Sequence, residues 1–113
     1  MPGTELDHRA LAAALESRIL DGAGKTPPAL RRKSFERAGG GPPINQPYDD
    51  LARQIGQSAS HVTDDQLGRV VQAAGSEKAA FEIVLTAAAG AGLLRFRSAM
   101  KALEEATDAS GRD

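Results

Sequence analysis

The chain has 113 residues, of which 41% are hydrophobic and 26% charged, and its formal net charge is -1. A chain of this length is expected to form one domain with one modest core, here residues 1–113. A net charge this small provides no long-range attraction for nucleic acid or anionic lipid, so we expect neither as a partner. The chain contains no cysteine, which excludes disulfides, thiolate metal sites and thiol-based redox chemistry.

The apolar content consists mostly of Ala, Leu, Val and Ile, and only 4% of the residues are aromatic. Small side chains bury little area each, so such a chain gains stability by burying further surface against a partner subunit. We therefore expect a homo-oligomer, with a different protein as the alternative partner. Residues 1–7 show no export signal, and the apolar run Ile83–Leu94 is shorter than the 20 or so residues of a membrane span. These features predict a cytoplasmic protein without membrane contact.

The first two predicted helices lie before the glycine-rich region. Leu11, Leu15 and Ile19 recur every four residues, which predicts a helix over about 7–21 with this stripe facing the core. A second helix is predicted to run to about residue 38, with Thr26 as its cap and Pro27 at the first helical position.

Residues 39–47 combine three glycines and three prolines, which predicts a loop or hinge. Helical spacing resumes over about 47–57. The next helix starts at a capping box, in which Thr63 and Gln66 satisfy each other's backbone amides, and it ends at Gly75. Ser76 is predicted to cap the helix that follows.

The last helical stretch runs from Glu77 to about Ala106 and is interrupted by Gly90 and Gly92. We expect two helices, near 77–92 and 93–106, or one kinked helix, followed by a frayed tail over 108–113. No segment alternates as a half-buried strand does. The fold class is therefore predicted to be all-α, a small bundle of five to six helices that interlocks in an oligomer.

Glu82 is the carboxylate that the apolar pattern places nearest a buried position. Burial would raise its pKa and suit it to act as a general base. The simpler interpretation, which we favour, puts Glu82 on a solvated or interfacial flank, paired with Lys78 one turn away. His8 and His61 lie far apart without carboxylates at ligand spacing, so the sequence predicts no metal site, and no motif indicates a cofactor.

Two features of the sequence could contact nucleic acid, a cluster of basic residues and a pair of helices. Arg31, Arg32, Lys33 and Arg37 could meet phosphates, but a solvated helix face is favoured because aromatic residues for base stacking are missing. The helices on either side of Gly75 have the spacing of a helix-turn-helix. However, the second one, over 81–89, carries no Arg, Asn or Gln to contact base edges and is predicted to lie in a core.

The alanine- and glycine-rich part of the last helix can approach another backbone closely, either within the chain or in another subunit. Apolar residues recur beyond it at Leu93, Phe96, Met100 and Leu103. The candidate helix-packing or interface residues are Ala87, Gly90, Ala91, Gly92, Phe96 and Met100.

The segments 62–66, 75–77, 81–85 and 87–95 together resemble the C-terminal part of the alkylhydroperoxidase D and carboxymuconolactone decarboxylase superfamily, over about residues 47–103. The resemblance implies an all-helical domain whose protomers interlock as dimers, trimers or hexamers. In the peroxidase members it implies a pair of cysteines assisted by histidine and glutamate. This chain has no cysteine, so thiol peroxidase activity is excluded.

Two functional hypotheses follow. The first is a non-catalytic or degenerate helical domain of this superfamily that acts through self-assembly or assembly with a partner. The alternative is a cofactor-free enzyme related to carboxymuconolactone decarboxylase, a lyase or isomerase. It would use Glu82 as its base and Arg95 to hold a carboxylate substrate.

Overall fold

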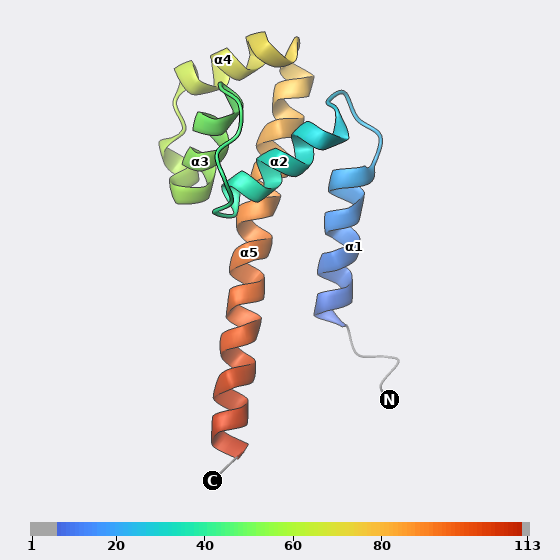
Figure 1. The fold of residues 1–113 in the computed structure, drawn as a ribbon, viewed down its shortest axis with the longest axis vertical. Helices are drawn as coiled ribbons and strands as arrows, with labels where there is room; N and C mark the ends of the chain where they lie inside the picture. Colours follow the sequence, from blue (N-terminus) through green and yellow to red (C-terminus); the bar gives the residue numbers. More distant parts are fainter. Residues whose placement is uncertain (1–6, 112–113) are drawn as a thin grey trace.

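The computed structural model describes residues 7–111, and within this range the chain is helical with no strand. Five helices and one short 3-10 helix occur in the order α1 (His8–Asp21), α2 (Pro28–Ala38), α3 (Tyr48–Ser58), η2 (Ala59–His61), α4 (Asp64–Ala74) and α5 (Glu77–Gly111). In Figure 1, α2, α3 and α4 gather around the N-terminal half of α5, and α1 runs beside the middle of α5. The predicted all-α class is confirmed.

The main core lies where α2, α3 and α4 pack against the N-terminal half of α5. Leu51, Val70 and Ile83 are fully buried there and come from three different helices. The cluster also contains many alanines; its members are Ala38, Leu51, Ala52, Ile55, Val70, Ala80, Ile83, Ala87 and Ala91. A smaller cluster joins α1 to α2 and α5 through Ala12, Leu20, Phe35 and Leu93. Small side chains therefore bring these helices close together.

Two glycines let α2 cross its neighbours at backbone contact. A Cβ atom at Gly90 of α5 would collide with the carbonyl oxygen of Phe35. A Cβ atom at Gly56 of α3 would collide with the carbonyl oxygen of Ala38. The close approach predicted around Gly90 thus occurs within the chain, with α2 as the neighbouring helix.

The helix boundaries around α4 are confirmed. The Thr63 hydroxyl accepts from the Gln66 amide at 3.1 Å, while the Gln66 side chain accepts from the Thr63 amide at 3.0 Å. Gly75 ends α4 in the left-handed conformation at φ 94°, and the Ser76 hydroxyl accepts from the Ala79 amide at the start of α5.

The predicted start of α2 was wrong by one position. Pro27 is the cap and Pro28 the first helical residue, and no side chain caps this end. The Thr26 hydroxyl donates instead to Glu82. A long-range carboxylate thus takes the hydroxyl that the local pattern assigned to the cap.

α5 is one continuous helix of 35 residues. The expected division near Gly92 is absent because Gly90 stays helical under α2, and Figure 1 shows no break in the ribbon there. The helix also continues through residues 108–111, which were predicted to fray, whereas residues 112 and 113 lie outside the described range. By length and composition α5 could cross a membrane over Glu77–Asp108, although 44% of its most apolar window is buried against the rest of the chain.

The apolar stripe of α1 does not face the core. Leu11 and Leu15 are 56% and 50% exposed, whereas Ala12 and Leu20 are buried. Two ion pairs join α1 to α5, one between Arg9 and Glu104 and the other between Glu16 and Arg97. Leu11 and Leu15 therefore lie at the surface because α1 packs through a neighbouring face that contains Ala12 and Leu20.

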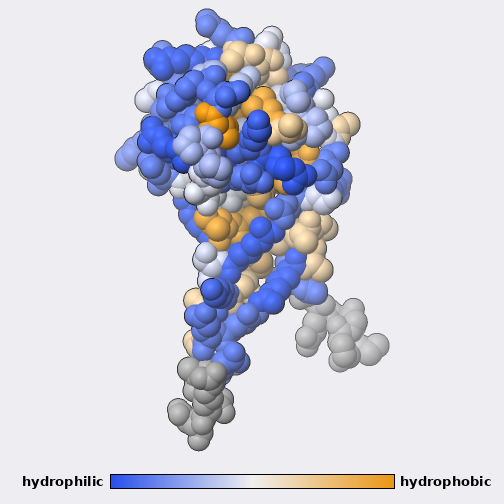
Figure 2. Space-filling view, viewed as in Figure 1, coloured by the Kyte–Doolittle hydropathy of each residue, from blue (hydrophilic) through white to orange (hydrophobic). Residues whose placement is uncertain are grey.

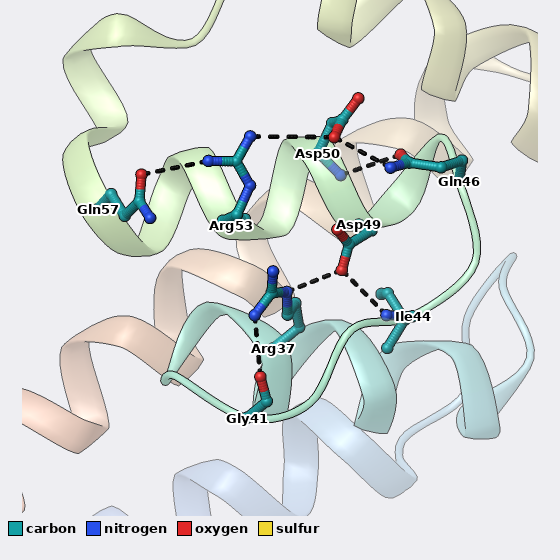
Figure 3. A network of polar contacts seen from close by, with 8 residues as sticks. All are labelled: Arg37, Gly41, Ile44, Gln46, Asp49, Asp50, Arg53 and Gln57. Carbon is teal, nitrogen blue, oxygen red and sulfur yellow. Dashed lines mark hydrogen bonds and ion pairs between the residues drawn. The ribbon is translucent and has the colours of Figure 1, made fainter.

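The glycine- and proline-rich loop over 39–47 is held by a buried carboxylate, shown in Figure 3. Asp49 accepts from the Arg37 guanidinium at 2.7 Å and from the Ile44 amide at 2.9 Å, and Arg37 also donates to the Gly41 carbonyl. The Ile44 hydrogen bond lowers the pKa of Asp49; burial opposes this effect, and Arg37 and Arg53 add to it. The ionised carboxylate thus fixes the loop.

Candidate functional site

Glu82 binds the connection between α1 and α2. Its carboxylate accepts from the Lys25 amide at 2.5 Å, the Thr26 amide at 3.3 Å and the Thr26 hydroxyl at 3.0 Å. Burial alone raises the pKa of Glu82, but these hydrogen bonds and the charge of Arg31 together outweigh it and lower the pKa below its ordinary value. The raised pKa expected of a general base is therefore wrong. The pairing with Lys78 that we favoured is not formed either, because both oxygens of the half-buried Glu82 accept from the loop instead.

Arg31 secures the same connection from the other side. It is buried, and its guanidinium donates to the carbonyls of Ile19 and Gly22 at 2.9 and 2.6 Å. The last carbonyls of a helix lack partners within the helix, so Arg31 satisfies the end of α1. Glu82 and Arg31 thus hold the two ends of one loop.

The four basic residues of α2 do not share one solvated face. Arg31 caps α1, Arg37 pairs with Asp49, and Arg32 pairs with Asp21 at 3.1 Å. Only its fourth member, Lys33, is an exposed side chain without an ion pair in the described part of the chain. The sequence pattern missed this division because the partners lie in other elements.

Glu82 and Arg95 do not form a common site. Arg95 is exposed and donates to the Gly56 carbonyl of α3 at 2.8 Å. The two side chains are thirteen residues apart on a continuous helix, which corresponds to about 20 Å along its axis. A single small carboxylate substrate could not contact both.

An apolar groove opens beside Glu82, between α4 and the first turns of α5. Its volume is about 1100 Å³. Leu67 and Val71 line it from α4, while Phe81 and Val84 line it from α5. The remaining lining residues are Ala23, Gly24, Lys25, Glu77, Lys78, Ala80 and Glu82. The groove is therefore apolar inside and charged at its rim.

A second feature is an exposed stripe along α5, which we call the α5 stripe. It consists of residues that alternate four and three positions apart, the spacing of a coiled-coil seam. Its members, all exposed, are Phe81, Leu85, Ala88, Gly92, Arg95, Ala99, Ala102 and Ala106. Phe81 and Leu85 are 61% and 54% exposed, and a Cβ atom at Gly92 would meet nothing within 4 Å. In Figure 2, hydrophobic residues reach the surface among hydrophilic ones.

The six candidate interface residues fall into three environments: buried within the chain, half-buried beside α1, and exposed on the α5 stripe. Ala87, Gly90 and Ala91 are buried within the chain, so they serve internal helix packing and are not available to a partner. Phe96 and Met100 are half-buried beside α1, where they line a small cavity. Gly92 alone among the six lies in the open, on the α5 stripe.

Residues 81–89 were predicted to lie in a core, and this prediction is wrong for one side of the helix, which is exposed. Ile83, Thr86 and Ala87 are buried, whereas Phe81 and Leu85 are exposed. The alternating three- and four-residue spacing was the available signal. It marks a packing face, but it does not tell whether the same chain supplies the neighbour.

Both histidines are exposed, His8 in the first turn of α1 and His61 in η2. In the described part of the chain, no three side chains of the metal-binding types gather. Comparison with protein-family models, with curated proteins and with solved structures finds no match to this chain.

Proposed function

We propose that this chain is a non-catalytic assembly domain that associates with a second copy of itself through the α5 stripe. The observation that carries the proposal is the exposure of Phe81 and Leu85 in register with Ala88 and Gly92 on a long helix. Large apolar side chains scattered singly on a surface need no explanation. Two of them one turn apart, at the start of a periodic row of mostly small residues on one helix face, form the pattern of an unoccupied packing surface.

Simple energetics support association. Full burial of one Phe or Leu side chain stabilises by about 1.5–3 kcal/mol. A symmetric dimer buries each such residue in both copies, and Phe81 and Leu85 are 61% and 54% exposed in the single chain, so together they offer about 3–7 kcal/mol before the cost of association. That cost is about 4–15 kcal/mol, so further contacts along the stripe are needed for a stable dimer.

We propose membership of the superfamily that the sequence resembles. An all-helical chain without cysteine agrees with a catalytically degenerate member of the alkylhydroperoxidase D-like superfamily. The alternative, a cofactor-free lyase or isomerase, needs a free base and an arginine near the same substrate. Glu82 and Arg95 are occupied by separate structural contacts, and this favours the assembly domain.

The proposal is tested by placing a charge on the α5 stripe without disturbing the fold. Gly92→Lys fits, because the position is open and any ordinary residue favours the helix more than glycine does. The added charge has the same sign as Arg95 on the α5 stripe, so it repels a second copy in either direction of packing. We expect the wild-type chain to elute as a dimer at micromolar concentration, measured by light scattering after gel filtration. Gly92→Lys should elute as a folded monomer with unchanged helical circular dichroism.

Gly68→Lys is the matched control. Gly68 also lies in a helix, is exposed and has open space, but it belongs to α4 and lies outside the α5 stripe. This variant should remain a dimer. A wild-type chain that is monomeric at micromolar concentration, or a Gly92→Lys variant that stays dimeric, contradicts the proposal.

A further inference from the structure

We infer that the two copies pack antiparallel, so that the C-terminal end of α5 of each copy lies in the groove between α4 and α5 of the other. This inference rests on the proposed self-assembly and adds its geometry. The groove and the α5 stripe are continuous, because Phe81 belongs to both. The occupant of the groove is therefore a defined segment of the second copy, over residues 99–108.

The sizes of the side chains favour this direction. The N-terminal half of the α5 stripe carries Phe81 and Leu85, whereas its C-terminal half carries Arg95 and then only alanines, at Ala99, Ala102 and Ala106. In an antiparallel pair, a stripe position that follows a four-residue step faces one that follows a three-residue step in the neighbour. Phe81 then lies opposite Ala106 of the second copy, Leu85 opposite its Ala102 and Gly92 opposite its Arg95. Each of these three layers combines one large and one small residue.

A parallel arrangement would lose this match. Phe81 would then face Phe81 of the second copy, and the alanines would face each other at the opposite end. Two helices packed at an even distance would be overfilled at one end and would leave voids at the other, and both defects are destabilising.

The charges favour the same direction. Lys25 and Lys78 stand at the rim of the groove, and neither has an ion-pair partner among the residues that the structure describes. Glu105 and Asp108 are exposed at the other end of α5, likewise without an ion pair in the described range. The antiparallel arrangement brings these carboxylates to the lysines, whereas a parallel one brings Lys78 to Lys78 and Glu105 to Glu105. The opposed helix dipoles also attract each other only in the antiparallel case.

The contact area explains why the groove is needed. The α5 stripe spans twenty-six residues from Phe81 to Ala106, about 37 Å along the axis, and a helix about 10 Å wide covers about 370 Å² over that length. A stable interface buries about 800 Å² on each partner. The α5 stripe alone therefore supplies about half. The walls of the groove, Leu67 and Val71 of α4 among them, add area only when a helix enters it.

Disulfide cross-linking tests the direction, because the chain has no cysteine of its own. Ala88 and Ala99 are exposed members of the α5 stripe and lie in adjacent positions across the antiparallel seam. Ala88→Cys and Ala99→Cys are prepared separately, one carrying an affinity tag, then mixed and oxidised mildly. We expect the mixed, singly tagged dimer to be the main cross-linked product.

Self-linked dimers should be scarce in the antiparallel arrangement. The two Ala88 positions then lie about 16 Å apart along the seam. A disulfide requires Cα atoms within about 7 Å. Predominant self-linking of both variants overturns the antiparallel arrangement while leaving self-assembly intact. No cross-linking in any mixture, together with monomer masses, removes the assembly itself.

Charge exchange provides the second readout. Lys78→Glu should weaken the dimer by about fivefold for each ion pair lost, measured as a dissociation constant by sedimentation equilibrium. Adding Glu105→Lys to the same chain should restore most of the affinity, because the pair re-forms with opposite signs across the seam. In a parallel dimer like charges would still face each other after the exchange, so an absence of rescue overturns the arrangement.

Discussion

The two faces of α5 differ in a way opposite to the usual expectation for a globular protein. The inner face, against α2, α3 and α4, carries mostly small residues such as Ala80, Ala87 and Gly90. The outer face carries Phe81 and Leu85, two of the larger apolar side chains of the helix, and both are mostly exposed. Apart from Ile83 and Leu93, burial of α5 within the chain thus uses small residues that allow close approach, while Phe81 and Leu85 remain for another surface.

This difference teaches that the size of a residue is a poor guide to its burial in this chain. α2 can cross α5 at backbone contact only because the inner face lacks side-chain bulk at Gly90. A larger residue there would separate the helices and open the core. The outer face has no such restriction, since Gly92, two residues later, has open space around it.

The largest expected effect contrasts one large apolar residue on each face. Ile83 is fully buried, so Ile83→Ala should lower the free energy of unfolding by about 2–5 kcal/mol. Leu85→Ala, at a dilution where the chain is monomeric, should change it by less than about 0.5 kcal/mol. Urea denaturation followed by circular dichroism measures both. Equal losses would show that the outer face is buried within the monomer.

A smaller effect is expected for the two glycines. Gly90→Ala places a methyl group against the Phe35 carbonyl and should destabilise the chain by about 1–3 kcal/mol. Gly92→Ala should stabilise the monomeric chain by up to about 1 kcal/mol, because alanine favours the helix and meets no obstacle. Thermal denaturation of the dilute proteins separates the two. A stable Gly90→Ala variant would contradict the backbone contact between α2 and α5.

The smallest change in stability is expected at Glu82, which lies between the two faces of α5. Glu82→Gln should cost about 1–2 kcal/mol at neutral pH, because the amide replaces a charged acceptor of three hydrogen bonds. The folded-state pKa of Glu82 is lowered, so its contribution is complete above the ordinary glutamate pKa. The contribution disappears as the pH falls through the lowered value.

The measurement is stability against pH for the wild-type chain and the Glu82→Gln variant. The two curves should converge as the pH falls through the acid range. Asp49, whose pKa is also lowered, should keep a shallower acid dependence in the variant. A constant difference at every pH would show that Glu82 does not act as an ionised acceptor.

Local signals in the sequence were sufficient for most of the fold. The capping box at Thr63 and the left-handed Gly75 could be predicted because their partners lie within a few residues. The contacts of Glu82 could not, because its donors lie more than fifty residues away in a loop. The same holds for Arg37, whose carboxylate partner follows the glycine- and proline-rich loop.

The candidate site was only partly accessible from sequence. Periodicity assigned the apolar stripe of α1 and residues 81–89 of α5 to a core, and it offered Phe96 and Met100 as interface residues although they are half-buried within the chain. Spacing carries no information about which face the chain itself covers. On α1 the covering contacts use Ala12 and Leu20 and leave Leu11 and Leu15 outside. Only the three-dimensional arrangement separates an internal stripe from an unoccupied one.

The central claim, that the α5 stripe is covered by a second copy in solution, is tested most directly by the reactivity of one thiol on it. Ala88→Cys places the only cysteine of the chain on the stripe, and Ala73→Cys places one on the exposed surface of α4, outside both stripe and groove. The alkylation rate of the thiol in Ala88→Cys should fall as protein concentration rises, whereas the rate in Ala73→Cys should stay constant. Equal rates for both thiols at every concentration would contradict the account.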